Sequence, residues 1–379
     1  MYSVPIITAF CLFPFIAFLI TFPYILVQYG TYGSINKIRT VIIYSFILYL
    51  LCAYFLVILP LPEISEVTSS VGVELKPFRF INDIISNSPL VITDVSTYLS
   101  VFGEPHLYQV LYNLILLLPL GVYLRYYFKR GFFTTSLIVF LVSLFFEVTQ
   151  LTGLYGIYPY AYRLFDVDDL IINTLGGMLG YAITPLFSFF LPTREEIDED
   201  AYKKGVNVSK LRRFIAFLID FLFIIFVGSL FTIFFKFPNI ISVLAFEDLE
   251  CYLFYFFYCM FYFGVLSIFT KGKTLGKKLV NIRLYKENIK YYDYNLRAFL
   301  LFVVVLPSFK YSMLLLENVK TTSVVLSIFF SILNIALGVF YLINVFIFIF
   351  SKKKMFHEKL SGVVNISTVN YEEKKEVDE

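Results

Sequence analysis

Long apolar runs separated by short polar segments occupy almost the whole chain. A helix needs about 20 apolar residues to cross a bilayer core about 30 Å thick. Runs of this length predict nine membrane-spanning helices in an all-α, polytopic fold. The predicted spans are residues 4–27, 40–61, 106–124, 132–151, 169–191, 214–235, 251–269, 297–316 and 323–350.

A polar stretch at residues 192–210 interrupts this pattern. Its charged side chains cannot be buried in lipid, so it predicts a solvated cytosolic linker between two membrane units. The first unit, residues 1–191, carries five spans and the second, residues 211–370, carries four. A charged tail, residues 371–379, follows the second unit.

Basic residues predict the orientation of the chain. Most of the 31 lysines and arginines fall in the alternate connections that share one side with the C-terminus. Because basic residues are retained in the cytoplasm, we expect the N-terminus outside and the C-terminus inside. The first apolar run is too long for the core of a signal peptide and should remain as an anchor.

Composition agrees with a membrane protein and excludes several other classes. Hydrophobic residues make up 59% of the chain and charged residues only 16%, which is not typical of a soluble globule. The net charge of +3 gives no reason to expect a nucleic-acid partner. The 4 cysteines lie inside apolar runs, so we expect no disulfide, no metal site and no cofactor.

The long connection at residues 62–105 carries an amphipathic pattern. Phe78, Ile81, Ile84 and Ile85 recur at helical spacing, which predicts a short helix in the outer headgroup region. Such a helix could pack over the bundle or cover a substrate, and the first alternative is favoured.

Polar side chains gather at the predicted outer ends of three spans in the first unit. An ionised group inside a membrane is costly and is kept only with a partner or a function. Helical spacing puts Glu147 and Gln150 on one face, and Asp166, Asp169 and Asn173 on another. We predict a binding cluster made of Asn113, Glu147, Gln150, Arg163, Asp166, Asp169 and Asn173.

This region resembles the VanZ family of bacterial membrane proteins over residues 40–190. The resemblance rests on Asn113 with Pro119-Leu120-Gly121, on Glu147-x-x-Gln150, on Arg163-x-x-Asp166-x-x-Asp169-x-x-x-Asn173-Thr174-Leu175-Gly176 and on Gly180-Tyr181. The family's named member is associated with low-level resistance to the glycopeptide teicoplanin. The resemblance therefore implies a phenotype and no reaction.

Three interpretations of the cluster remain open. Arg163 and the amides could neutralise Glu147 and Asp169 and so hold the helices in register. The cluster could instead bind a lipid or sugar headgroup. Paired carboxylates could also act as general acid and base, but no supporting triad or metal motif is present. Binding is therefore favoured over catalysis.

The second unit opens with an aspartate two turns inside an apolar helix. Asp220 lies too far along the axis from Arg213 for a direct ion pair, so a partner elsewhere is expected. Asn334 or a basic cytosolic residue is favoured over Lys310.

Alternating residues 280–291 predict a small cytosolic β-hairpin, and residues 364–366 could add a third strand.

Residues 208–370 resemble the RDD family, which is named for one arginine and two aspartates. Arg213-x-x-Ala216-x-x-x-Asp220, Gly272-Lys273-Thr274-x-Gly276-Lys277 and His357-Glu358-x-x-x-Gly362 carry this resemblance. Glu358 stands where the family has its second aspartate. The resemblance implies cation or proton movement, with a site at Arg213, Asp220, Lys273, His357 and Glu358.

The sequence thus predicts a multi-pass protein of the bacterial plasma membrane. The favoured hypothesis is recognition of a lipid or glycan headgroup by the first unit, which contributes to glycopeptide tolerance. Its expected partners are membrane lipids and, beyond them, a lipid-linked cell-wall precursor or a lipoglycopeptide. The alternative is a transporter coupled to cations or protons, in which Asp220 carries the coupling charge.

Overall fold

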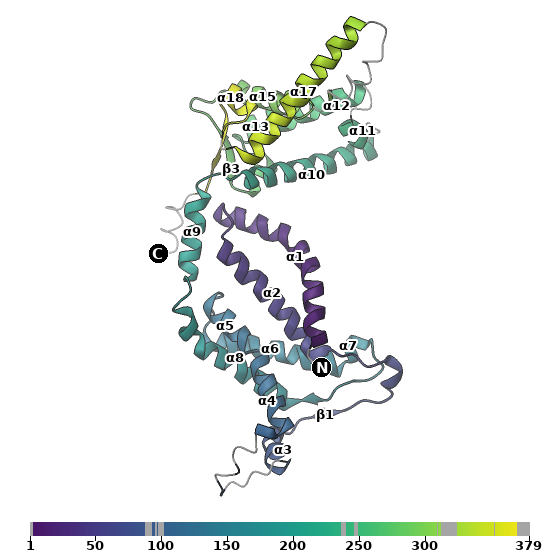
Figure 1. Ribbon diagram of the computed structural model, residues 1–379, viewed down its shortest axis with the longest axis vertical. Coiled ribbons are helices and arrows are strands. Elements are labelled where there is room, and N and C mark those ends of the chain that lie inside the picture. The colour runs from purple at the N-terminus through teal and green to yellow at the C-terminus, as the bar shows by residue number, and fades with distance from the viewer. Residues whose placement is uncertain are drawn as a thin grey trace. The chain divides into compact units, whose positions relative to one another are not determined.

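The computed structural model describes residues 3–87, 93–94, 97, 102–235, 240–245, 249–308, 310–311, 324–351 and 353–369 (Figure 1). Within them, eight helical segments are long and apolar enough to cross a membrane, which confirms a polytopic helical protein. They are Ser3–Tyr32, Lys37–Ile58, Pro105–Tyr126, Phe132–Leu151, Val167–Ser188, Lys210–Phe234, Glu250–Phe269 and Val324–Phe350.

These segments correspond to eight of the nine predicted spans. The remaining one, residues 297–316, lies partly outside the described residues. Its described part begins as a helix, because α15 (Tyr291–Phe299) continues into the π-helical segment η4 (Leu300–Val305).

The chain forms two compact units. Unit 1 comprises Met1–Phe22 and Asn36–Asp198, and unit 2 comprises Pro23–Ile35 and Glu199–Glu379. The end of α1 (Ser3–Tyr32) therefore belongs to the second unit, where Tyr29 packs into an apolar cluster with Ile215 and Ile219. The predicted division at residue 191 placed all of this helix in the first unit.

The polar segment between the predicted units is a helix, α9 (Arg194–Gly205). Its first turns belong to unit 1, where Asp198 pairs with the buried Arg39. Its last turns belong to unit 2, where the Ser34 hydroxyl donates to the Ala201 carbonyl at 2.6 Å. Ile197 and Ala201 are buried, so the segment has a packed face as well as a solvated one.

In unit 1 the helix α8 (Val167–Ser188) lies at the centre. It packs against α4 (Pro105–Leu116), α5 (Leu118–Tyr126) and α6 (Phe132–Leu151), while α2 (Lys37–Ile58) contacts α6 (Figure 1). Pro119 lies in the first turn of α5. Proline has no backbone N–H group, but at this position that group would have no acceptor within the helix. This proline explains why the third predicted span is two helices.

Glycines let these helices approach at backbone distance. A Cβ on Gly176 or Gly180 would collide with the Leu114 or Leu118 carbonyl oxygen. A Cβ on Gly121 would likewise collide with the Gly177 carbonyl oxygen. Gly176 and Gly180, which form a Gly-x-x-x-Gly pattern, are therefore a site of close helix packing.

The connection after α2 contains the predicted short helix, α3 (Arg79–Asn87), as well as the 3₁₀ turn η1 (Ile64–Glu66). The strand β1 (Val73–Glu74) pairs in parallel with β2 (Phe165–Asp166), just before α8. A four-residue turn, α7 (Gly153–Gly156), follows α6.

In unit 2, α10 (Lys210–Phe235) is followed by α11 (Ile240–Ala245), α12 (Leu249–Cys259), the π-helical segment η3 (Met260–Val265) and α13 (Leu266–Phe269). The last long helix is α17 (Val324–Phe350). Phe263 in η3 stacks on Phe302 in η4, with ring centroids 3.9 Å apart. This contact lies in the apolar core of the unit.

Short elements follow the ends of these helices: α14 (Leu275–Leu279), β3 (Ile282–Tyr285), α18 (Phe356–Ser361) and β4 (Val364–Ser367). The predicted hairpin is wrong, because β3 pairs antiparallel with β4 rather than with residues 289–291. Those residues lead into α15, whose start is fixed by Asp293 accepting a 2.7 Å hydrogen bond from the Lys290 amide. The predicted strand at residues 364–366 is confirmed.

Candidate functional site

The seven predicted residues of unit 1 lie on α4, α6, α8 and the segment before α8. We call them the unit 1 polar cluster. The Asn113 amide donates to the Asp169 carboxylate, and the Asp166 backbone amide donates to Glu147 Oε2 at 3.2 Å. Asn173 Nδ2 donates to the Ser143 hydroxyl at 3.0 Å. The hydrogen bonds thus join the three helices, as their polar faces predicted.

Arg163 attracts Glu147 and Asp169 electrostatically but forms no direct ion pair with either of them. Its guanidinium donates to the Val57 and Leu59 carbonyl oxygens at 2.6 and 3.3 Å. Gln150 Nε2 also donates to the Val57 carbonyl oxygen, at 2.9 Å. Among the described residues, neither Glu147 nor Asp169 has a basic group within 4 Å.

Asp168 is a residue of this region that the sequence analysis did not include. Its carboxylate accepts hydrogen bonds from the Phe78 and Phe80 amides at 2.6 and 3.1 Å, and so holds the start of α3. Asp166 caps α8 by accepting from the Asp168 amide at 2.9 Å. Burial raises the pKa of Asp166, although that hydrogen bond opposes the shift.

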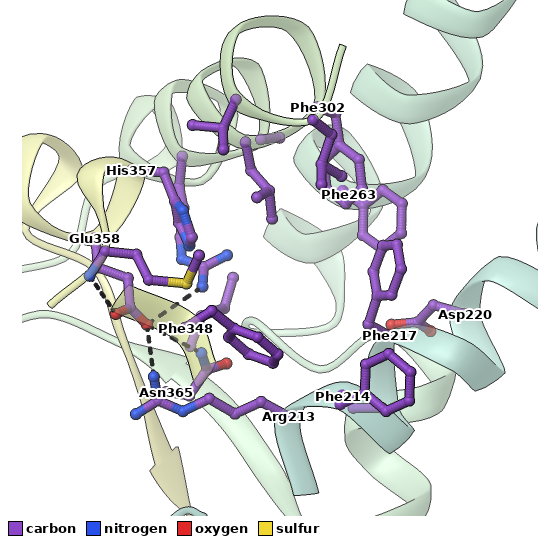
Figure 2. A pocket seen from close by; sticks show the side chains of 18 of the residues that line it. Arg213, Phe214, Phe217, Asp220, Phe263, Phe302, Phe348, His357, Glu358 and Asn365 are labelled. Atoms are coloured by element: carbon purple, nitrogen blue, oxygen red, sulfur yellow. Dashed lines mark hydrogen bonds and ion pairs between the residues drawn. The ribbon is translucent and has the colours of Figure 1, made fainter. Parts of the chain in front are cut away.

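Unit 2 contains a cavity of about 330 Å³ between α10, α14, α15, η4, α17 and α18. Of the predicted site residues, Arg213, Asp220, His357 and Glu358 line it (Figure 2). Lys273 does not line it, whereas Lys277, one helical turn further on, does. The resemblance thus pointed to the correct segment of the basic loop, but the lysine at the cavity is a different one.

Asp220 holds the loop that precedes and begins α14. It is 1% exposed and accepts hydrogen bonds from the Tyr262 hydroxyl, the Thr274 hydroxyl and the Gly276 amide at 2.7, 2.5 and 2.7 Å. A Cβ on Gly276 would collide with the Ala216 carbonyl oxygen, so this close approach needs glycine. Neither Asn334 nor Lys310 is among these partners. The expected contact between Asp220 and Asn334 is therefore wrong.

Glu358 joins the two ends of unit 2. Its carboxylate lies 3.0 Å from the Arg213 guanidinium and 3.9 Å from that of Arg297. Glu358 Oε2 also accepts from the Met355 amide at 3.2 Å, which caps α18. The glutamate therefore forms ion pairs with both arginines, although the family pattern has an aspartate at this position.

The remaining ionisable residues at the cavity are strongly affected by burial. Burial lowers the pKa of Lys277 to about 8, against the attraction of Asp220. Burial and the positive charges of Arg297, Arg213 and Lys277 lower the pKa of His357 to about 2, so this imidazole is neutral. The sequence marked neither shift, because both depend on contacts between distant segments.

Arg212 is a buried neighbour of Arg213 with a different role. Its guanidinium donates to the carbonyl oxygens of Val280, Gly205 and Asn281 at 2.6, 2.8 and 2.5 Å. It is 0% exposed and does not line the cavity. We interpret Arg212 as a structural clamp.

The described residues bring together no group of three or more His, Cys, Asp or Glu suited to a metal ion.

This architecture defines a multi-pass helical membrane protein made of two units. Residues 46–188 match the VanZ/LLP1 family model, and residues 208–362 match the model of the RDD family. The chain thus joins a VanZ-like region to an RDD-family region, which confirms both resemblances. No curated protein and no solved structure matches the chain.

Proposed function

We propose that this protein contributes to glycopeptide tolerance in the bacterial plasma membrane by recognising a lipid or glycan headgroup at the unit 1 polar cluster. One observation carries the proposal. Glu147 is 3% exposed, and neither it nor Asp169 has a basic partner within 4 Å among the described residues. Carboxylates of low exposure that have no cation in direct contact favour a ligand that supplies hydrogen-bond donors.

The chemistry of the cluster fits a headgroup rich in hydroxyl, amide or ammonium groups. Asp169 receives the Asn113 amide and Glu147 receives the Asp166 amide, so each carboxylate keeps further acceptor capacity. The side-chain oxygen Oδ1 of Asn173 is buried without a hydrogen-bond partner and can accept another donor. A lipid-linked cell-wall precursor or a lipoglycopeptide would offer such donors.

Two isosteric variants test this function. Glu147→Gln and Asp169→Asn keep the shape of each side chain but remove its charge. We expect teicoplanin tolerance to be lost while the melting temperature and protein level stay near those of the wild type. Glu195→Gln is the matched control, since this carboxylate lies in unit 1, is 70% exposed and pairs with Lys129. Parallel loss of tolerance and of folded protein would instead identify a purely structural cluster.

The proposal requires the cluster to face outward. In a cysteine-free background, a cysteine at the exposed Val71 should react with an impermeant maleimide in intact cells. A cysteine at the exposed Lys203 should react only after permeabilisation. The reverse pattern would place the cluster on the cytoplasmic side and contradict recognition of an outer headgroup.

A second candidate function is cation or proton transport by unit 2. The cavity supports it, because Asp220 and Glu358 line a space bounded by membrane-spanning helices. Asp220→Asn should then abolish cation-driven or proton-driven flux in reconstituted vesicles. Wild-type vesicles that show no flux under sodium, potassium and proton gradients would contradict this candidate.

A further inference from the structure

The cavity of unit 2 has two chemically different walls. One wall is aromatic and includes Phe217, Phe263 and Phe302. Figure 2 shows these rings across the cavity from His357 and Glu358. A space with one apolar and one polar side matches a ligand that is itself amphiphilic.

The residues that line the cavity carry an excess of positive charge. Arg213, Lys277 and Arg297 line it, against only Asp220 and Glu358. These carboxylates are already engaged, Asp220 by three neutral donors and Glu358 by the two arginines. Among the described residues, no carboxylate lies within 4 Å of the Lys277 ammonium, which is 9% exposed and donates to the Thr274 hydroxyl at 3.2 Å. Asp220 attracts the Lys277 ammonium without a direct ion pair. The three cations that line the cavity therefore exceed its two carboxylates by one charge.

Three residues that line the cavity also have buried polar atoms without a hydrogen-bond partner. They are Arg213 Nε, Asn344 Oδ1 and His357 Nδ1, from three different helices. Buried polar groups in native proteins are nearly always satisfied, so such a cluster needs an explanation. A polar headgroup in the cavity would supply the missing partners.

We propose that this cavity binds an anionic amphiphile, with its charged headgroup at Lys277 and Arg297 and its hydrocarbon chain along the phenylalanine wall. Arginine and lysine together recognise phosphate and carboxylate groups. The volume of about 330 Å³ accommodates a headgroup with the first part of one chain. This site is separate from the unit 1 polar cluster and does not depend on the function proposed for it.

Binding can be measured on the full-length protein in a neutral detergent by isothermal titration calorimetry. The probes are decyl phosphate, decanoate, inorganic phosphate and decanol. We expect the two anionic amphiphiles to bind at least about tenfold more tightly than decanol, because only they pair with the buried cation. Inorganic phosphate should bind at least about tenfold more weakly than decyl phosphate, because it buries no apolar surface.

Lys277→Met should weaken decyl phosphate binding by about tenfold or more. The variant should fold, because the apolar side chain has a similar length and Asp220 keeps its three hydrogen-bond donors. Lys278→Met is a matched control, because Lys278 is the next residue along the chain, is exposed and does not line the cavity; it should bind like the wild type.

Several outcomes would overturn the proposal. Equal affinity for decanol and decyl phosphate would show that no anion is recognised. Equal affinity for inorganic phosphate and decyl phosphate would identify a free anion as the ligand. Unchanged binding by folded Lys277→Met protein, or no binding of any probe to the wild type, would also reject it. None of these results bears on glycopeptide tolerance, which depends on unit 1.

Discussion

The Arg213 guanidinium lies 3.0 Å from the Glu358 carboxylate, although the two residues are 145 positions apart. Arg213 lies near the start of α10, and Glu358 lies in the first turn of α18 after the last long helix. The pair therefore connects the first turn of α10 to the short helix that follows α17. Both residues lie in segments that carried the resemblance to the RDD family, and both line the cavity.

Removing the charge of Glu358 should destabilise unit 2. Glu358→Gln leaves Arg213 and the buried Arg297 without their carboxylate, and an unpaired buried charge is costly. Because Arg213 is 30% exposed, we expect a loss of about 2–4 kcal/mol, less than a fully buried pair would give. The melting temperature should fall accordingly.

Glu358→Asp, which restores the family residue, should lose clearly less stability than Glu358→Gln. Glu287→Gln is the control, because Glu287 is exposed in the same unit. Equal melting temperatures for Glu358→Gln and the wild type would mean that the ion pair contributes nothing to stability.

The close contact between α8 and α5 should not tolerate even one methyl group. A Cβ on Gly180 meets the Leu118 carbonyl oxygen, so Gly180→Ala forces the helix backbones apart. We expect a loss of about 1–3 kcal/mol in thermal unfolding experiments. Gly131→Ala has nothing within 4 Å of its new Cβ and should change stability by less than about 0.5 kcal/mol. Similar effects of the two substitutions would argue against backbone contact at Gly180.

Asp168 should control the order of the connection that contains α3. Asp168→Asn keeps one acceptor but points an amide donor at the Phe78 or Phe80 amide, so about 1–3 kcal/mol of local stability should be lost. Hydrogen exchange of residues 78–87 should become faster while that of α8 changes little. Asp83→Asn, at a 38% exposed carboxylate on α3, provides the comparison. Unchanged protection of residues 78–87 would contradict this role.

Lys277 should make unit 2 less stable at neutral pH than at alkaline pH. Burial lowers its pKa from the ordinary 10.5 to about 8, so between these values the unfolded chain binds the extra proton. Stability contributed by this residue therefore rises from about pH 8 to about pH 10.5. Below about pH 8 the folded protein bears the full free-energy cost of burying the charged ammonium.

Melting temperatures of the wild type and Lys277→Met test this sign. The variant should melt higher at pH 7, and the difference should shrink as the pH rises towards 10.5. Tyr294, Arg213, Arg297, Asp220, Glu358 and His357 also face the cavity. Asp220, Arg297 and His357 interact electrostatically with Lys277, so the difference reports Lys277 together with these interactions. A difference that grows with pH would show that the charged lysine stabilises the fold.

Properties that depend on neighbouring residues were determined by the sequence alone. A bilayer requires a certain length of apolar helix, so the spans could be located without knowing what packs against them. The short helix α3 and the strand β4 were also predicted, because their patterns lie within a few residues. The polar cluster of unit 1 followed from helical spacing, which places Glu147 and Gln150 on one face.

Only the tertiary structure decided which groups meet. Arg163 binds backbone carbonyls at Val57 and Leu59 rather than a carboxylate, a choice that no local pattern encodes. Strand β3 pairs with β4 across α15 and α17 rather than with the residues that follow it. Lys277 rather than Lys273 reaches the cavity, because the loop is fixed by the hydrogen bonds of Asp220. These outcomes depend on contacts between segments far apart in the chain, whose energies no single segment carries.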